Sequence, residues 1–289
     1  MMSGSNLLSI YNRLRDLGVA QSFSIAFTPR SGSTLLCRVL RGLSCGLPDE
    51  YFQYPYESNR LSVHNGLSSA EDVLSFIGNH TGNQIFSSKL SNDQRAHLDE
   101  HLERIFDGYR SLDDLLPNHR WVLLTRRDLI DQAISLFIAK KTGRWLLESG
   151  DQWDANAHVK YDYFGIFADL LYTASSALSL DAYFDFLGVT PFKLHYEDLI
   201  ERPRQTLDGL FEYLKLRAPR PLAPTLDDGN LVRISQHAEG LYTGLRARFL
   251  EDLMNTGRTD RRQRLGRELA NWDQFFIEEQ WARASASAQ

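Results

Sequence analysis

A short loop rich in hydroxyl side chains is the first place in this chain where residue types and spacing suggest chemistry. Arg30, Ser31, Gly32, Ser33 and Thr34 stand between an apolar, β-prone segment and a run of leucine and valine at helical spacing. The start of a helix offers unpaired backbone N–H groups and the positive end of the helix dipole, so it binds phosphate or sulfate groups. The sequence therefore predicts an anion-binding loop. The plainer alternative is a polar turn capped by serine or threonine.

The loop differs from a Walker A motif at the residue that reaches the outer phosphates of a nucleoside triphosphate. In that motif a lysine follows the second glycine, whereas Ser33 follows Gly32 here. Thr34 keeps the hydroxyl that binds Mg²⁺ in the motif, but no glycine stands five residues before Gly32. The sequence therefore disfavours an ordinary ATPase or GTPase and favours a donor with less terminal charge, such as a phosphosulfate.

Two acids followed by aromatic residues form a second candidate region. Asp49 and Glu50 come directly before Tyr51 and Phe52, and Tyr54 follows. Aromatic faces pack against the C–H surfaces of sugars and carboxylates bind sugar hydroxyls, so the segment is a candidate wall for a carbohydrate. The alternative is the first turn of a helix with its favoured acids and a packed aromatic cluster.

Cationic residues follow two further segments that are predicted as strands. Lys89 ends one of them, and Arg126 and Arg127 follow the strand predicted over 121–125. In open α/β sheets, ligands bind at the carboxyl ends of the strands. The two arginines, with Ser135 about two turns into the next helix, predict either a phosphate site or ordinary salt bridges to nearby aspartates.

The predicted strands alternate with helices along the chain. We expect the strands at 22–27, 84–88, 121–125 and 190–195. This alternation predicts an α/β fold, a single P-loop-like domain whose central parallel sheet is flanked by helices. The expected domain covers residues 1–289, with an N-terminal helix in 1–20, a core over 22–250 and a partly frayed C-terminal extension over 258–289.

The composition is that of an ordinary globular protein, with 43% hydrophobic and 24% charged residues. A net charge of −5 disfavours a general nucleic-acid binder, which would carry a basic stripe. We expect no integral membrane segment and a cytoplasmic protein, since the sequence has no long apolar run and no signal-peptide pattern. The two cysteines and eight histidines lack metal-ligand spacing, so we expect no metal. The oligomeric state stays open, a homodimer included.

The motifs, taken in chain order, resemble those of sulfotransferases and most closely the bacterial trehalose 2-sulfotransferase family. The similar segments are 28–36, 46–54, 88–90 and 126–145, within a resemblance that covers roughly residues 22 to 250. The resemblance implies 3′-phosphoadenosine 5′-phosphosulfate (PAPS) as the donor. It also implies transfer of the sulfuryl group to a hydroxyl of a carbohydrate or glycolipid-type acceptor, trehalose or another hydroxyl compound.

Two residues, an acid and an arginine, are expected to have catalytic roles. Sulfuryl transfer is an in-line displacement, in which the acceptor hydroxyl must lose its proton as the new bond forms. Glu50 matches the acidic position of the family and is the expected general base, whereas Asp49 is expected to point elsewhere. Arg30 is expected to stabilise the charge that gathers on the bridging and departing phosphate oxygens.

The remaining predicted site residues bind the donor or the acceptor. Residues 30–34 are expected to bind the 5′ group of PAPS, and Arg126 with Ser135 to bind its 3′-phosphate, with Arg127 as the reserve candidate. The expected acceptor contacts are Tyr51, Gln53, Tyr54, Lys89 and Trp145. A nucleotide-dependent kinase and a non-catalytic nucleotide-binding protein are the alternative functions.

Overall fold

The structure is a computed structural model, and it describes residues 5–52, 67–145, 159–216 and 239–255. The chain divides into two compact units, each described here by itself. The first, the sheet unit, comprises residues 1–127 and 175–231, and the second, the helical unit, comprises 128–174 and 232–289. The domain boundaries expected from the sequence stay a prediction.

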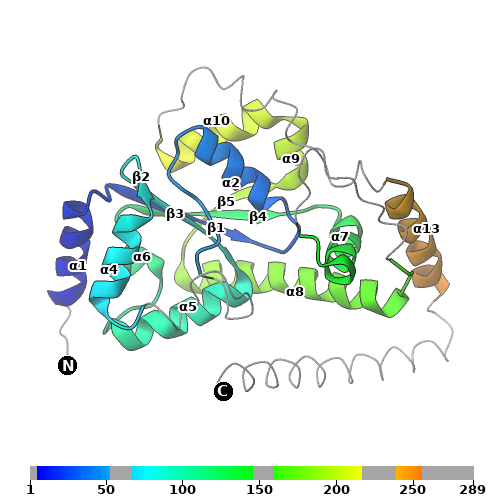
Figure 1. Ribbon diagram of the computed structural model, residues 1–289, viewed down its shortest axis with the longest axis horizontal. Helices are drawn as coiled ribbons and strands as arrows, with labels where there is room; N and C mark the ends of the chain where they lie inside the picture. Colours follow the sequence, from blue (N-terminus) through cyan, green and yellow to red (C-terminus); the bar gives the residue numbers. More distant parts are fainter. Residues whose placement is uncertain (1–4, 53–66, 146–158, 217–238, 256–289) are drawn as a thin grey trace. The chain divides into compact units, whose positions relative to one another are not determined.

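A five-stranded sheet is the centre of the sheet unit (Figure 1). Its strands are β1 (Gln21–Phe27), β2 (Thr81–Gly82), β3 (Ile85–Ser91), β4 (His119–Thr125) and β5 (Phe192–His195). In the order β2-β3-β1-β4-β5, β1 pairs in parallel with β3 and β4, and β4 pairs in parallel with β5. The predicted fold class is confirmed, with one correction: the sheet is mostly rather than wholly parallel, because the short edge strand β2 is antiparallel to β3.

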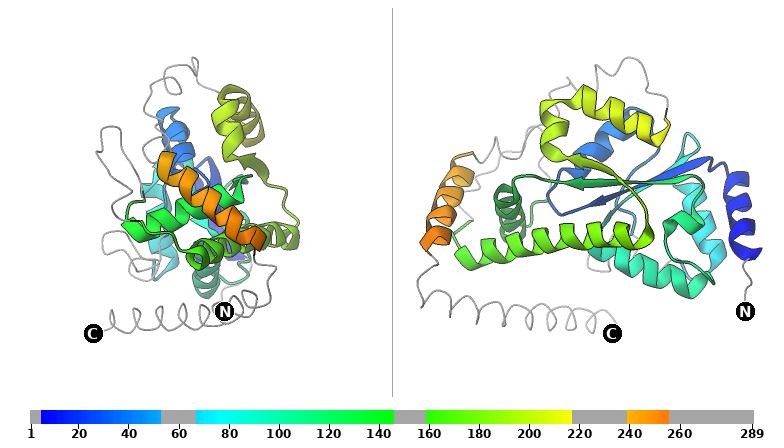
Figure 2. Two further views of the ribbon diagram at one scale, coloured as in Figure 1. Left: turned by 90° about the vertical axis from the view of Figure 1, so that its right-hand side faces the viewer. Right: turned by 180° about the vertical axis from the view of Figure 1, so that it is seen from behind.

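Helices cover both faces of this sheet. Those of the sheet unit are α1 (Ser5–Asp16), α2 (Ser33–Gly42), α4 (Ala70–Asn79), α5 (Asn92–Ile105), α6 (Leu112–Leu115), α9 (Tyr196–Glu201) and α10 (Pro203–Leu214). Helix α8 (Tyr163–Leu187) begins in the helical unit and ends in the sheet unit. Figures 1 and 2 show α2, α9 and α10 on one face, and α4, α5, α6 and the last part of α8 on the other.

Alternate side chains of β1 pack into the first of two hydrophobic layers. Phe23 and Ile25 point to the face that α2, α9 and α10 cover, where they pack with Leu36, Leu40 and Phe211. A strand in the middle of a parallel sheet is buried on both faces, which explains why β1 is almost continuously apolar apart from small serines. The first layer fixes α2, and hence the loop before it, against the sheet.

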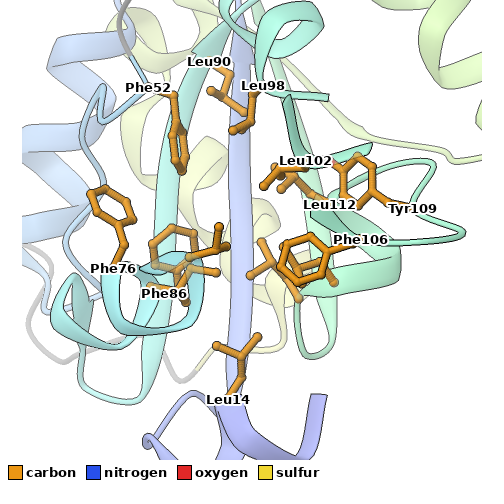
Figure 3. Packing of buried hydrophobic residues seen from close by; sticks show 14 of the residues in the cluster. Leu14, Phe52, Phe76, Phe86, Leu90, Leu98, Leu102, Phe106, Tyr109 and Leu112 are labelled. Carbon is orange, nitrogen blue, oxygen red and sulfur yellow. The ribbon is translucent and has the colours of Figure 1, made fainter. Parts of the chain in front are cut away.

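The second layer lies on the other face and is rich in aromatic residues (Figure 3). Phe86 and Leu90 of β3 pack there with Phe52, Phe76 and Leu102. Fully burying one such side chain contributes about 1.5 to 3 kcal/mol. The layer therefore anchors the chain just after residue 50 to the sheet.

The helical unit contains α7 (Leu129–Thr142), α13 (Glu239–Asn255) and the first part of α8. Phe137, Ile166 and Phe249, one from each helix, meet in its buried cluster. Arg246 of α13 donates to the carboxylates of Asp128 and Asp131 at the start of α7. Within the described ranges, no helix combines the length and the apolar character needed to cross a membrane.

Candidate active site

The loop between β1 and α2 has the backbone of an anion-binding loop. Gly32, at the N-cap of α2, has φ +86° and ψ +17°, and Arg30 is also left-handed with φ +66°. Left-handed residues within a turn gather backbone N–H groups into a concave surface that binds anions. A non-glycine residue in this conformation costs on the order of 1 to 3 kcal/mol, and such strain is found mainly at functional sites.

The N-terminus of α2 keeps its backbone donors available. Gly32 has no side chain that could cap the helix, and the first N–H groups of a helix have no partner within it. Ser31 and Ser33 are buried, and the Ser31 Oγ has no hydrogen-bond partner among the described residues. Thr34 is partly exposed, and its hydroxyl accepts a hydrogen bond from Lys89. The contacts that these side chains are predicted to make with a donor stay predictions.

Tyr196 closes one side of the loop. A Cβ atom added to Gly32 would lie 2.5 Å from Cδ2 of the Tyr196 ring, so only glycine fits there. Tyr196 follows β5, and Arg126 at the end of β4 lies over the same ring, with its guanidinium carbon 5.1 Å from the ring centroid. The Tyr196 ring therefore connects the loop between β1 and α2 to Arg126.

The two arginines after β4 have different surroundings. The Arg127 side chain is 48% exposed and forms an ion pair with Asp198, while its backbone N–H donates to the Glu197 carboxylate at 3.0 and 3.1 Å. Arg126 is 16% exposed, and its Nε lies 3.8 Å from Glu197 Oε1. Arg126 is thus the arginine beside the loop. Ser135 is buried in α7 of the helical unit, so its pairing with Arg126 stays a prediction.

Glu50 is connected to the loop through Lys89. The Lys89 Nζ lies 2.7 Å from Glu50 Oε2 and 3.1 Å from Thr34 Oγ1. Both partners of the ion pair are largely enclosed, with 7% of the Lys89 side chain and 20% of the Glu50 side chain exposed. The positions are set by backbone pairing, because Asp49 forms a parallel bridge with Ser88, and the Lys89 N–H donates to the Asp49 carbonyl at 2.8 Å.

The other oxygen of Glu50 is held by a residue that the sequence reasoning missed. Gln94 Nε2 donates to Glu50 Oε1 at 2.7 Å. Gln94 also forms a capping box at the start of α5: its side-chain oxygen accepts from the Ser91 N–H at 2.9 Å, and its N–H donates to the Ser91 hydroxyl. The Ser-x-x-Gln spacing in the sequence is the signal that could have identified the cap.

Asp49 points away from the ion pair. One of its carboxylate oxygens accepts from Arg41 at 3.2 Å, and the other accepts from the Glu50 N–H at 2.8 Å. Of the two adjacent acids, Glu50 is therefore the one beside Lys89 and the loop.

The structure brings together only part of the predicted acceptor wall. The Tyr51 ring packs edge-on against Phe52 and Phe76, its hydroxyl donates to the Leu47 carbonyl, and burial raises the pKa of Tyr51 to about 12. Tyr51 thus belongs to the aromatic packing of the second layer. Trp145 is 45% exposed and lies in the helical unit. Gln53 and Tyr54 lie outside the described residues, so the predicted acceptor contacts stay predictions.

The fold is that of an α/β protein with a mostly parallel sheet, and a left-handed turn follows its first strand. The family model for Stf0 sulphotransferase matches residues 22–230, and the chain belongs to this family. Membership in the family indicates a transferase of sulfuryl groups. Among the described residues, no group of three or more His, Cys, Asp or Glu side chains could hold a metal ion.

Several solved structures are similar to this chain. The sulfotransferase domain from the curacin biosynthetic pathway is 16% identical, with a TM-score of 0.43 over 75% of this chain and 82% of that chain. Mouse sulfotransferase SULT7A1 complexed with PAP is 12% identical, with a TM-score of 0.40 over 77% and 71% of the two chains. The sulfotransferase domain from the Synechococcus PCC 7002 olefin synthase is 16% identical, with a TM-score of 0.40 over 75% and 82%. The search of curated proteins found no match.

Proposed function

We propose that this protein transfers the sulfuryl group of PAPS to a hydroxyl group of a carbohydrate or glycolipid-type acceptor, with Glu50 as the general base. The observation that supports this most directly is the ammonium of Lys89, which contacts both Glu50 and Thr34 of the loop. A carboxylate beside an anion-binding loop is what an attacking hydroxyl requires. A protein that only binds nucleotides has no need of it.

The donor would lie with its 5′ end against the loop. The first N–H groups of α2 and the guanidinium of Arg30 would neutralise the charge left on the 5′-phosphate when the sulfur–oxygen bond breaks. Glu50 would take the proton of the acceptor hydroxyl as the new bond to sulfur forms. Arg126, beside Tyr196, is the proposed contact of the 3′-phosphate, together with Ser135.

This reaction requires no metal in the proposal, because the loop and Arg30 supply the positive charge. We propose that the acceptor is trehalose, another sugar or a glycolipid head group, since the partly buried ring of Tyr51 can offer a face to a sugar. The exposed ring of Trp145 is a further proposed contact, and so are Tyr51, Gln53, Tyr54 and Lys89.

A transfer assay with radiolabelled PAPS tests the proposal. The assay is run in EDTA with trehalose, other sugars, phenols and steroids as acceptors, and binding of 3′-phosphoadenosine 5′-phosphate (PAP) is compared with binding of ATP by calorimetry. We expect tighter binding of PAP than of ATP and label on a carbohydrate hydroxyl. A preference for ATP with turnover restored only by Mg²⁺ would favour a kinase, binding without transfer would favour a non-catalytic protein, and label on a phenol would contradict the carbohydrate acceptor.

A further inference from the structure

Gln94 has an unusual combination of contacts for a helix-capping residue. In a capping box the side chain of the third helical residue accepts a hydrogen bond from the N–H of the cap residue. Gln94 makes this bond with Ser91, and its side-chain NH₂ group donates a second hydrogen bond to Glu50. One planar group therefore connects the start of α5 to the proposed base.

The amide of Gln94 is oriented by the capping box. Its oxygen is occupied by the Ser91 N–H at 2.9 Å, so its nitrogen must point the other way, toward Glu50 Oε1 at 2.7 Å. A glutamine elsewhere could rotate its amide by half a turn, but here the rotation would place two N–H donors against each other. Gln94 can therefore only donate to Glu50.

The carboxylate of Glu50 is held from two sides as a result. Lys89 donates to Oε2 and Gln94 donates to Oε1, each at 2.7 Å. A carboxylate has about four acceptor positions, so these two bonds fix its plane and leave a position on each oxygen for an incoming hydroxyl. Sites whose reacting groups are fixed in advance lose less rate to misorientation, since an error of about 1 Å can cost a hundredfold.

We propose that Gln94 is a positioning residue that orients the Glu50 carboxylate for proton transfer from the acceptor hydroxyl. The inference rests on the proposed function, because it assigns Gln94 a role only through Glu50. Gln94 itself touches neither donor nor acceptor in this proposal. The capping box links the base to α5, which is anchored to the sheet through Leu98 and Leu102 of the second layer.

Two variants separate positioning of the base from capping of the helix. Gln94→Glu keeps the oxygen that accepts from Ser91 but loses the amide that donates to Glu50. Ser91→Ala removes the hydroxyl of the cap and leaves the Gln94 amide in place. We expect Gln94→Glu to lower kcat by about tenfold to a hundredfold with PAP affinity unchanged. Ser91→Ala should lower the melting temperature and leave kcat within about twofold of wild type.

A double-mutant cycle with Glu50→Gln supplies the decisive readout. If Gln94 acts through Glu50, Gln94→Glu slows the enzyme that has Glu50 and causes no further loss in the Glu50→Gln background. Gln94→Met, which also lacks the amide donor, repeats the cycle without a second negative charge. Thermal unfolding and PAP binding establish for every variant that the protein is folded and its donor site intact.

The outcomes distinguish this inference from the proposed function. Equal losses of kcat in both backgrounds, or Gln94 variants as fast as wild type beside a slow Glu50→Gln, overturn the positioning role alone. A wild-type chain that transfers no sulfuryl group, or a Glu50→Gln variant with normal turnover, overturns the proposed base and the positioning role with it.

Discussion

Two ion pairs of similar length and burial lie one before α5 and one within it, and they differ in what surrounds them. Lys89 and Glu50 approach to 2.7 Å, and Arg95 and Asp99 approach to 2.8 Å. The first pair joins separate segments of the chain at the carboxyl edge of the sheet, beside the loop between β1 and α2. The second joins residues one helical turn apart, and the Tyr109 hydroxyl donates to the second oxygen of Asp99 at 2.7 Å.

The difference shows that burial and pairing do not by themselves mark an active site. The Arg95 guanidinium stacks on the Tyr183 ring at 3.9 Å, so apolar and aromatic groups enclose that pair. Burial raises the pKa of Asp99, while hydrogen bonding from Tyr109 and the charge of Arg95 oppose the shift. Through Tyr109 and Tyr183, which lie outside α5, the pair connects this helix to other parts of the sheet unit. Glu50, by contrast, lies beside a loop with strained backbone and available N–H donors.

The sharpest test of this comparison is to remove the basicity of each carboxylate in turn. Glu50→Gln keeps the shape of the side chain, and we expect it to lower kcat by about 10² to 10⁴ with PAP affinity nearly unchanged. Asp99→Asn is the matched control and should leave kcat per folded molecule near that of wild type. Normal turnover of Glu50→Gln together with a slow Asp49→Asn would show that the base is misassigned.

Stability gives a second test, because the enclosed Arg95–Asp99 pair is expected to contribute to the unfolding free energy. Asp99→Ala leaves the Arg95 charge enclosed without its partner, and breaking a buried ion pair in this way costs about 3 to 5 kcal/mol of unfolding free energy. Urea unfolding followed by circular dichroism measures the loss. A change below about 1 kcal/mol would place this pair with ordinary surface ion pairs and remove the contrast.

The arginines after β4 extend the comparison to the donor. Arg126→Ala should weaken the binding of PAP by about 1.5 to 3 kcal/mol, since it removes a charged hydrogen bond to the 3′-phosphate. The binding of adenosine 5′-phosphate should be weakened much less. Arg127→Ala removes an exposed ion pair, so its effect on either ligand should be about 1 kcal/mol or less. Calorimetric titration with both nucleotides measures the two effects. Equal weakening of PAP and adenosine 5′-phosphate by Arg126→Ala contradicts the assignment.

His119 is a largely enclosed titratable group with no counter-ion among the described residues. The Ser22 hydroxyl donates to the Pro117 carbonyl, so the Nδ1–H of His119 must donate to Ser22, while Nε2 is buried with no partner among the described residues. Burial lowers the pKa of His119 from 6.5 to about 3.

The sign of the pH effect follows from this depressed pKa. Between pH 6.5 and 3 the unfolded chain binds the extra proton and the folded chain does not, so stability falls as the pH is lowered through this window. At pH 5 the loss is about 2 kcal/mol. Comparing urea unfolding of wild type and His119→Asn at pH 7 and pH 5 isolates it. A difference between the two proteins that stays constant from pH 7 to pH 5 would contradict the prediction.

The parts of the site that could be predicted from the sequence are those written in one continuous segment. The turn over 30–34 could be predicted because an apolar strand, a glycine and the start of a helix follow one another in this part of the sequence. The contacts of Lys89 with Glu50 and Thr34 could not be predicted, because they depend on how β3 pairs with the chain around Asp49. Lys89 was expected only as an acceptor contact.

Gln94 and the edge strand were missed for different physical reasons. The capping box of α5 could have been predicted from the Ser-x-x-Gln spacing. The hydrogen bond from the Gln94 amide to Glu50 could not, because it depends on where the Asp49–Ser88 bridge places Glu50. Strand β2 has two residues, too few for any alternation to appear. A local sequence pattern reveals neither long-range strand pairing nor a strand of only two residues.

The contact between Gly32 and Tyr196 has a consequence for how the chain folds during its synthesis. The loop lies near the beginning of the chain, whereas the ring that encloses it arrives only with β5 and α9. Contacts between residues so distant in sequence form late, because a long intervening segment must first be closed. We therefore expect a nascent chain that has exposed α2 but not yet residue 196 to lack a finished anion-binding surface, so that donor binding reports completion of the sheet.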